Sequence, residues 1–261
     1  MAIPMLLLFV ALLALAACER IPRLRYTPSP LLRPFFGTDL VCFVTGALAL
    51  GLAVRALGLE LVGRWGSALP ALAGLHVAVA LPIAIVIYDL LSYLCHHAFH
   101  RFAGLWRLHK VHHSSLRLDW LATFRAHIFE HALRHVASSA ALLVLGFSPS
   151  AVGVAAATYA AWGALNHANL DLDLRTLEGV LITPRLHRLH HAEQTTERNL
   201  GTIFSIWDRW RGTLVTDAAA GPIGVPGERA TYPQTYLAQF FEPLRKRRDV
   251  RAPESDALEE I

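Results

Sequence analysis

The sequence predicts an all-α, polytopic membrane protein with about three spanning helices, a helical hairpin and a cytoplasmic histidine-rich site. Of its 261 residues, 54% are hydrophobic and only 17% are charged, whereas soluble domains carry about 25% charged residues. Long apolar runs alternate with short polar segments, and three short clusters hold eight of the 14 histidines. The net charge of +4 comes from intermixed acids and bases, so nothing indicates a nucleic-acid partner.

The first apolar run covers residues 1–18 and permits two interpretations. One is a membrane helix; the other is a secretory or lipoprotein signal, because small residues precede Cys18. A signal peptide carries positive charge before its apolar core, whereas here the basic residues follow it: Arg20, Arg23 and Arg25. This order favours a membrane helix and places residues 19–38 in the cytoplasm. Four prolines in that stretch predict a non-helical connector.

The next apolar runs, roughly residues 40–61 and 69–95, are long enough to span a bilayer. Pro82 predicts a kink in the second of them. Two shorter runs, roughly 132–147 and 151–165, predict a helical hairpin around a Ser-Pro-Ser turn. With the N-terminus outside, all three histidine clusters and the C-terminus fall on the cytoplasmic side. The positive-inside rule and the need to gather the clusters give this same topology.

The clusters read His96-x-x-x-His100, His109-x-x-His112-His113 and His187-x-x-His190-His191. Neutral imidazole is the commonest transition-metal ligand in proteins, and helical residues three or four apart share one face. Each cluster therefore directs two or three ring nitrogens the same way. Eight such ligands exceed the four that one zinc ion takes, and they suit two metal ions.

Other polar residues in the apolar part of the chain are further candidates for the site. Asp89 and Tyr93 share a helical stripe with His96, and they are the candidate catalytic residues. Asp89 is expected to accept the second ring N–H of a ligand histidine. His167 lies where the hairpin leaves the membrane, and we expect it to be a ninth ligand.

Five further histidines are not expected to be ligands. His131 and His135 interleave with Glu130 and Arg134 at helical spacing, which predicts an interfacial polar face and a structural role. The role of His127 stays open between structure and support of the site. His97 points away from the first cluster, and His76 is expected to be a packing histidine.

The ligand set favours a redox metal over a hydrolytic zinc ion. A zinc hydrolase usually has a Glu general base, as in HExxH, and the sequence has no HExxH. Activation of an aliphatic C–H bond needs a redox metal and O₂, and a membrane scaffold brings alkyl chains to such a site. Iron therefore fits ligands and setting together, although spacing alone leaves zinc open.

The motifs resemble the fatty acid hydroxylase / sterol desaturase superfamily over roughly residues 85–215. The resemblance rests on the three clusters and on Leu105–Ser114, Thr123-x-Arg125-x-His127-x-x-Glu130, Asn166–Asn169, Thr183–Arg185, Asn199-x-Gly201, Trp207–Arg209 and Gly212-Thr213. It implies a membrane-embedded, non-haem di-iron oxygenase that uses O₂. It also implies that the eight clustered histidines and His167 bind two iron ions. The three-residue spacer between His96 and His100 favours the hydroxylase/sterol branch over acyl-CoA desaturases.

We therefore predict a hydroxylase of a fatty acyl chain or sterol-like lipid, with lipid desaturation as the alternative. A remoter alternative is a zinc-binding membrane protein without oxygen chemistry. The expected domains are membrane helices and connector (1–84), a catalytic domain (85–215) and a cytoplasmic tail (216–261). The sequence shows no fused CxxC set, haem motif or dinucleotide fingerprint. An external ferredoxin- or cytochrome-type donor with its reductase is therefore expected.

Overall fold

The computed structural model describes residues 2–30, 32–48, 60 and 68–245. Every regular element within these residues is helical, and the only β-structure there consists of isolated bridges. The predicted all-α class is confirmed for this part of the chain.

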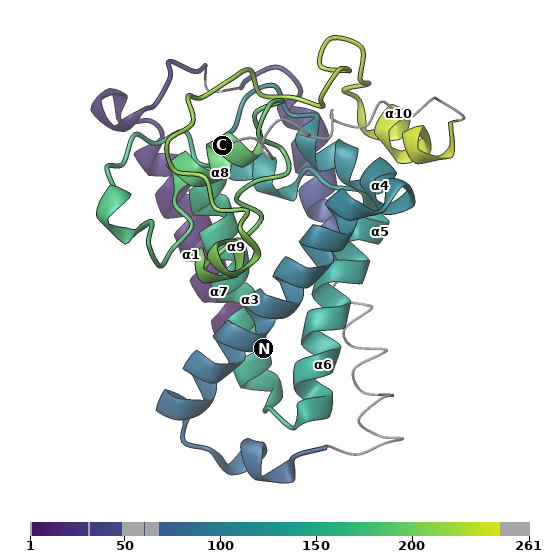
Figure 1. Ribbon diagram of the computed structural model, residues 1–261. Helices are drawn as coiled ribbons and strands as arrows, with labels where there is room; N and C mark the ends of the chain where they lie inside the picture. Colours follow the sequence, from purple (N-terminus) through teal and green to yellow (C-terminus); the bar gives the residue numbers. More distant parts are fainter. Residues whose placement is uncertain (1, 31, 49–59, 61–67, 246–261) are drawn as a thin grey trace.

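The helices form a narrow stem beneath a wider head (Figure 1). The stem contains α3 (Val77–Arg101), α6 (Ala137–Leu145) and α7 (Pro149–His167), and α1 (Ala2–Cys18) packs along α7. Small residues, including Ala80, Ala84 and Ala155, lie in the core between these helices. Small side chains let membrane helices approach closely. The predicted order of apolar helices is therefore realised as one packed stem.

The turn between α6 and α7 follows from its residues. α6 ends at Gly146, whose φ of 106° suits glycine. The Ser148 hydroxyl then accepts from Ala151 N, and Pro149 occupies the first turn of α7. Before α6, the short helix α5 (Ile128–His131) continues through a π-helical turn (Ala132–Val136). The predicted helical hairpin is thus present, with an earlier start than expected.

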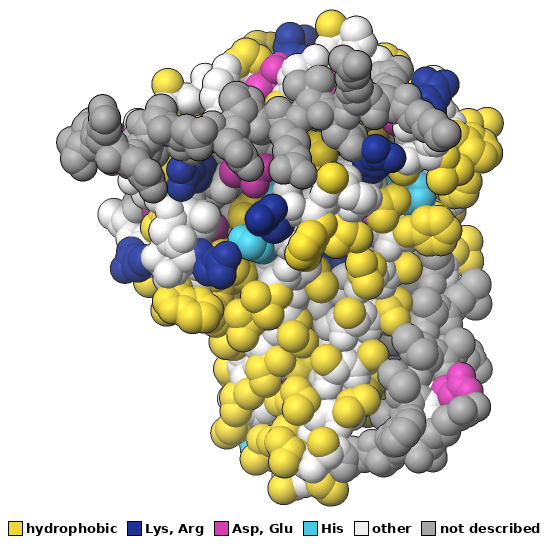
Figure 2. Space-filling model, turned by 45° about the vertical axis from the view of Figure 1, so that its right-hand side comes forward, with side chains coloured by type: hydrophobic (Ala, Val, Ile, Leu, Met, Phe, Trp, Pro, Cys, Tyr) yellow, Lys and Arg dark blue, Asp and Glu magenta, His cyan; other side chains and the backbone are white. Residues whose placement is uncertain are grey.

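Two helices are long and apolar enough to cross a membrane: Val77–Arg101 and Ile128–Leu145. The helices Ile3–Cys18 and Phe36–Leu48 are apolar but shorter. Of the predicted span at 40–61, only the part in Phe36–Leu48 lies within the well-described residues. Figure 2 shows hydrophobic side chains over most of the stem, while charged side chains gather on the head. This division matches a stem surrounded by lipid.

The head contains α4 (Ala103–His113), α8 (Pro184–His190), α9 (Ile206–Arg211) and α10 (Tyr236–Phe241). The connector has one short 3-10 turn, Pro22–Leu24, and otherwise runs as irregular chain until Phe36. It lies against the loop after α7, because Tyr26 N donates to Asn169 O and Asp171 N donates to Leu24 O. The head therefore joins the N-terminal connector to the ends of the stem helices.

Candidate metal centre

The structure brings all nine predicted ligand histidines into two neighbouring groups. Within each group, the candidate ligand nitrogens lie within 4.8 Å of one another, and none of the nine residues is more than 9% exposed. The five-histidine group is His96, His100, His109, His113 and His190. The four-histidine group is His112, His167, His187 and His191.

Each HxxHH cluster, called a histidine box below, divides its histidines between the two groups. On α4, His109 and His113 enter the five-histidine group, and His112 enters the other. At the end of α8 the division is reversed: His187 and His191 enter the four-histidine group. Residues four apart on a helix lie on one face, so the first and last histidines point together, whereas the middle histidine is rotated towards the other group. Two short helices therefore supply both groups at once.

The remaining ligands come from the upper ends of the stem helices. His96 and His100 lie in the last turns of α3, and His167 is the last residue of α7. α8 begins at Thr183, whose side chain accepts from Leu186 N, and Pro184 occupies its first turn. The site thus forms where two stem helices meet two head helices.

The Nε2 atoms converge as metal ligands would. The Nε2–Nε2 distance is 3.0 Å from His96 to His109 and 3.2 Å from His96 to His100. In the other group it is 3.3 Å from His167 to both His112 and His187. Two nitrogens bound at right angles to one ion, each about 2.1 Å away, lie about 3.0 Å apart. The donor set and its spacing therefore fit metal.

Some buried ring nitrogens have no hydrogen-bond partner among the residues that the structure describes. They include both nitrogens of His113 and Nε2 of His190. Buried polar atoms are nearly always satisfied, and a bound cation would satisfy these lone pairs. The unsatisfied nitrogens therefore support the same conclusion as the spacing.

The second nitrogen of most rings is held by the protein. Nδ1 donates to a backbone carbonyl at 2.6–3.0 Å in four rings: His96 to Leu200, His112 to Arg125, His167 to Gly163, and His190 to Arg198. A carbonyl only accepts, so Nδ1 carries the proton and Nε2 keeps its lone pair. These contacts fix the ring tautomer that metal binding requires.

Glu130 supports the five-histidine group, and its predicted interfacial placement is wrong. Its side chain is fully buried; Oε1 accepts from Nδ1 of His109 at 2.9 Å and also binds Arg134. A carboxylate on a ligand histidine orients the ring and raises its basicity. The signal was present in the sequence, since Glu130 closes the motif that begins at Thr123.

Asp89 has a different partner from the expected one. Its carboxylate accepts from the backbone N–H groups of Ile203 and Phe204 and from Nε1 of Trp207. It therefore fixes the loop before α9 to α3 and is not hydrogen-bonded to a ligand histidine. Tyr93 is buried outside both groups, with its ring centroid 6.4 Å from that of His97.

A second aspartate fixes the loop that carries Leu200, the partner of His96. Asp208 on α9 accepts from the N–H groups of Leu200 and Gly201 and from the Thr213 hydroxyl. A Cβ at Gly201 would lie 2.6 Å from the Phe204 carbonyl oxygen, so only glycine fits there. Gly201, Asp208 and Thr213 belong to the sequence motifs, but the motifs alone do not indicate that they hold this loop.

The other histidines lie outside both groups. His131 Nε2 donates to the Phe124 carbonyl at 3.1 Å, and His135 Nδ1 meets the Tyr88 hydroxyl at 2.9 Å. His127 bonds the Phe240 carbonyl, and His97 accepts from Arg211. His76 is exposed and caps α3 by accepting from Ala78 N, so the prediction of a packing histidine is wrong.

Burial also keeps the candidate ligand histidines of the two HxxHH clusters uncharged. It lowers the pKa of six rings well below the usual 6.5, and the neighbouring imidazoles lower it further. These rings are His109, His112, His113, His187, His190 and His191. They are therefore neutral near pH 7, the state in which imidazole binds metal.

The helical stem and the two buried histidine groups define a membrane-type metalloprotein of the histidine-box class. Residues 81–213 match the fatty acid hydroxylase family, and the chain belongs to that family. The matched range contains all nine candidate ligand histidines.

The chain is similar in sequence to a lipid hydroxylase and to alkylglycerol monooxygenases. The chain is 31% identical over 176 residues to the ornithine lipid hydroxylase OlsE of Rhizobium tropici, covering 66% of this chain and 52% of that one. It is 33% identical over 127 residues to an alkylglycerol monooxygenase of Danio rerio, covering 46% and 28% respectively. The human alkylglycerol monooxygenase is 28% identical over 160 residues, with 56% and 32% covered. The chain thus spans about half or less of these relatives. No solved structure gives a significant match.

Proposed function

We propose that this protein is a membrane-bound, non-haem di-iron oxygenase that uses O₂ and external electrons to hydroxylate a lipid. The observation that carries the proposal is the pair of adjacent histidine groups on shared helices. Two groups of five and four neutral nitrogen donors suit two transition-metal ions. Family membership supports iron over zinc.

Iron bound there would supply O₂ activation, placing one oxygen atom in a C–H bond and releasing the other as water, with two electrons and two protons from outside. The protein's own residues prepare the site. The Nδ1 contacts hold the rings in place before metal binds. Arg134 balances the charge of buried Glu130, which orients His109. Burial of all nine rings excludes bulk water.

A lipid is the substrate class that the surroundings favour. The ligands lie at the head end of an apolar stem, so an alkyl chain in the adjacent leaflet is close to them (Figures 1 and 2). The names of the relatives are those of lipid oxygenases, acting on ornithine lipids and alkylglycerols. The proposed lipid substrate carries either a fatty acyl chain or a sterol-like ring.

The topology and donor belong to the same proposal. The chain is multi-pass, with metal site and C-terminus in the cytoplasm, supported by the basic connector after α1. Residues 1–84 form the N-terminal membrane part, 85–215 the catalytic domain and 216–261 the cytoplasmic tail. Electrons come from a separate ferredoxin- or cytochrome-type protein with its reductase. A reporter fused after Ile261 should read cytoplasmic, and an external reading would overturn this topology.

The decisive experiment measures metal in the detergent-purified full chain. Elemental analysis should give about two irons per chain, and Mössbauer spectra of iron-57-labelled protein should show a coupled pair. Oxidised lipids should then accumulate in membranes of cells that express the protein. Stoichiometric zinc without iron, after iron-replete expression, would reject the oxygenase assignment. Double bonds in place of hydroxyl groups would indicate desaturation at the same site.

A further inference from the structure

Helix α10 has its polar side turned inward and its apolar side turned outward. Leu237 and Phe241 on α10, and Leu244 in the 3-10 turn Glu242–Leu244 that continues it, are 68%, 54% and 77% exposed. Their spacing of four and three residues places them on one side of this segment. Gln239 and Glu242, between them, are 1% and 7% exposed. A helix at a water-facing surface shows the opposite arrangement.

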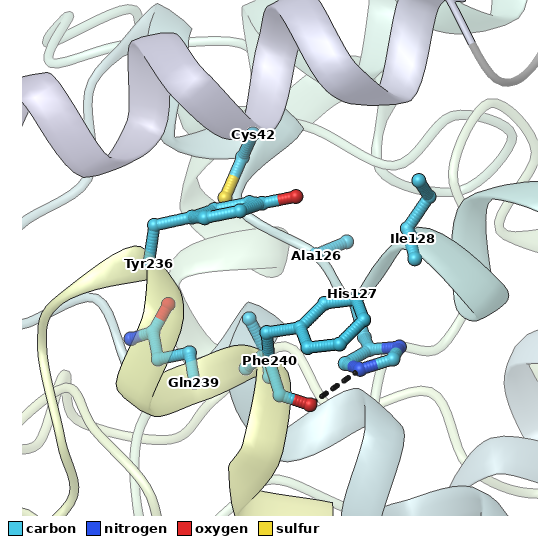
Figure 3. Close-up of a pocket in the computed structure, with 8 residues that line it drawn as sticks. Cys42, Ala126, His127, Ile128, Tyr236, Gln239 and Phe240 are labelled. Carbon is cyan, nitrogen blue, oxygen red and sulfur yellow. Dashed lines mark hydrogen bonds between the residues drawn. The ribbon is translucent and has the colours of Figure 1, made fainter.

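The inward side of α10 is firmly attached. Gln239 Nε2 donates to the Ser114 hydroxyl and the Pro233 carbonyl, both at 2.8 Å. The His127 ring stacks on Phe240, and its Nε2 meets the Phe240 carbonyl at 3.1 Å. Figure 3 shows this contact beside a small pocket between α10, the start of α5 and Cys42 of the helix Phe36–Leu48. The outward stripe is therefore a fixed surface.

The stripe adjoins the lipid-facing surface of the stem. The His127 ring that touches Phe240 also touches Phe129, with 5.3 Å between ring centroids. Phe129 is 62% exposed on the apolar helix Ile128–Leu145, and Leu133 one turn later is 46% exposed. One turn before Phe240, the Tyr236 hydroxyl contacts Thr45 of the helix Phe36–Leu48 at 3.3 Å. α10 thus bridges two apolar helices where they enter the head.

The basic sequence that follows the stripe along the chain points to one occupant. The sequence continues directly with Arg245-Lys246-Arg247-Arg248. An apolar stripe next to clustered basic residues is the pattern of helices that lie on anionic bilayers. A stable dimer needs about 800 Å² per partner, which three side chains on a six-residue helix do not supply.

We propose that α10 is an interfacial helix that inserts Leu237, Phe241 and Leu244 into the surface of an anionic phospholipid leaflet. The proposal rests on membrane insertion of the stem and not on the metal chemistry. Gln239 also binds Ser114, the residue after His113, so one hydrogen bond joins α10 to the C-terminal end of α4.

Photo-crosslinking tests the proposal without turnover or metal. A benzoylphenylalanine at Leu237 of the full chain, in nanodiscs of phosphatidylcholine and phosphatidylglycerol, should give lipid adducts on irradiation. The same probe at Thr231, exposed in the loop before α10, should give few. The same probe at Leu133, on the apolar helix Ile128–Leu145, should crosslink to lipid if the stem is inserted in the bilayer, whatever the position of α10. Among Leu237 adducts, the ratio of phosphatidylglycerol to phosphatidylcholine should be about five times their ratio in the nanodisc, the effect of one basic residue near an anionic surface.

Each other outcome overturns the proposal. Lipid adducts at Leu133 without any at Leu237 would show an inserted stem and a helix α10 away from the bilayer. Adducts of Leu237 with a second copy, or with another protein in native membranes, would assign the stripe to a protein interface. Adducts that follow the bulk lipid composition would refute the anionic preference. Absence of adducts at Leu133 would refute insertion itself, and with it this inference, while leaving metal binding to its own measurement.

Discussion

The five-histidine group and the four-histidine group share their helices but depend on different parts of the chain. In the five-histidine group, His96 and His190 bond the carbonyls of Leu200 and Arg198, and His109 bonds Glu130. All of these supports lie within residues 81–213, the segment that matches the family. This half of the site is therefore built from the family's own region.

One ligand of the four-histidine group is supported by residues outside that region. His112 bonds the carbonyl of Arg125, whose buried guanidinium binds Asp39. Asp39 also binds Arg33, which pairs with Asp119 as well. Arg33 of the connector and Asp39 at the start of the helix Phe36–Leu48 thus anchor the segment that orients His112. The comparison teaches that the ligands belong to the family motif, whereas the N-terminal connector of this chain supports one half of the centre.

The largest expected effect comes from removing a ligand of the four-histidine group. His191→Ala should lower bound iron from about two ions per chain to one or fewer and abolish lipid oxidation, because the four-histidine group has no spare ligand. His76→Ala is the control, since His76 is a helix cap far along α3 from the box histidines. Elemental analysis of both proteins checks this. Full iron content in His191→Ala would remove that residue from the ligand set.

Acid should destabilise both groups alike. Six rings have a lowered pKa in the folded protein, three from each group. Unfolded histidines take up protons near pH 6.5, whereas the buried rings resist protonation. Stability is therefore present above about pH 6.5 and is lost as the pH falls below it, by up to about 1.4 kcal/mol per ring per pH unit. Thermal unfolding of metal-free protein from about pH 8 to pH 5 measures this, and a flat profile would contradict it.

Weakening the connector should affect the four-histidine group selectively. Asp39→Asn leaves two buried arginines without their shared carboxylate, which typically costs about 3–5 kcal/mol. We expect a lower melting temperature and iron loss that begins with the four-histidine group, seen as loss of one Mössbauer component. Asp173→Asn, at a highly exposed ion pair, should change stability by less than about 0.5 kcal/mol. Equal loss from both groups would refute separate support.

A smaller effect is expected from the carboxylate beneath the five-histidine group. Glu130→Gln keeps the shape of the side chain but removes the charge that orients His109. Iron affinity of that group should fall about 10–100-fold. Glu197, whose side chain is 55% exposed and lies 3.5 Å from His100 Nδ1, provides the comparison. Glu197→Gln should change affinity by less than about threefold, and competition with a calibrated chelator would measure both.

The sequence predicted which histidines gather but not how they divide. Spacing predicted that each cluster directs its ring nitrogens the same way, whereas each HxxHH cluster divides between the two groups. The helical stem and hairpin followed from apolar runs. The assignment of His112 to the other group depends on how α4 and α8 cross, which is a tertiary property. All nine predicted ligands are brought together, and their role in binding iron stays a prediction.

The misread carboxylates have one physical cause. Glu130 and Arg134 share a helix face, and that pattern fits an exposed ion pair as well as a buried one. Only the packing of α4 against α5 makes the pair buried and adds His109 as a third member. Asp89 is the converse case: its position within a span indicated a role, but its partners come from a loop 114 residues away. Long-range partners of this kind leave no local signal.

The division of each histidine box between two groups also affects how the two metal ions bind. Because α4 and α8 each serve both groups, an ion that enters one group fixes helix positions that the other needs. Binding of the first ion thus reduces the ordering cost for the second, which is positive coupling between the two sites. An iron titration of the metal-free protein should then give fewer singly loaded molecules than two independent sites would give.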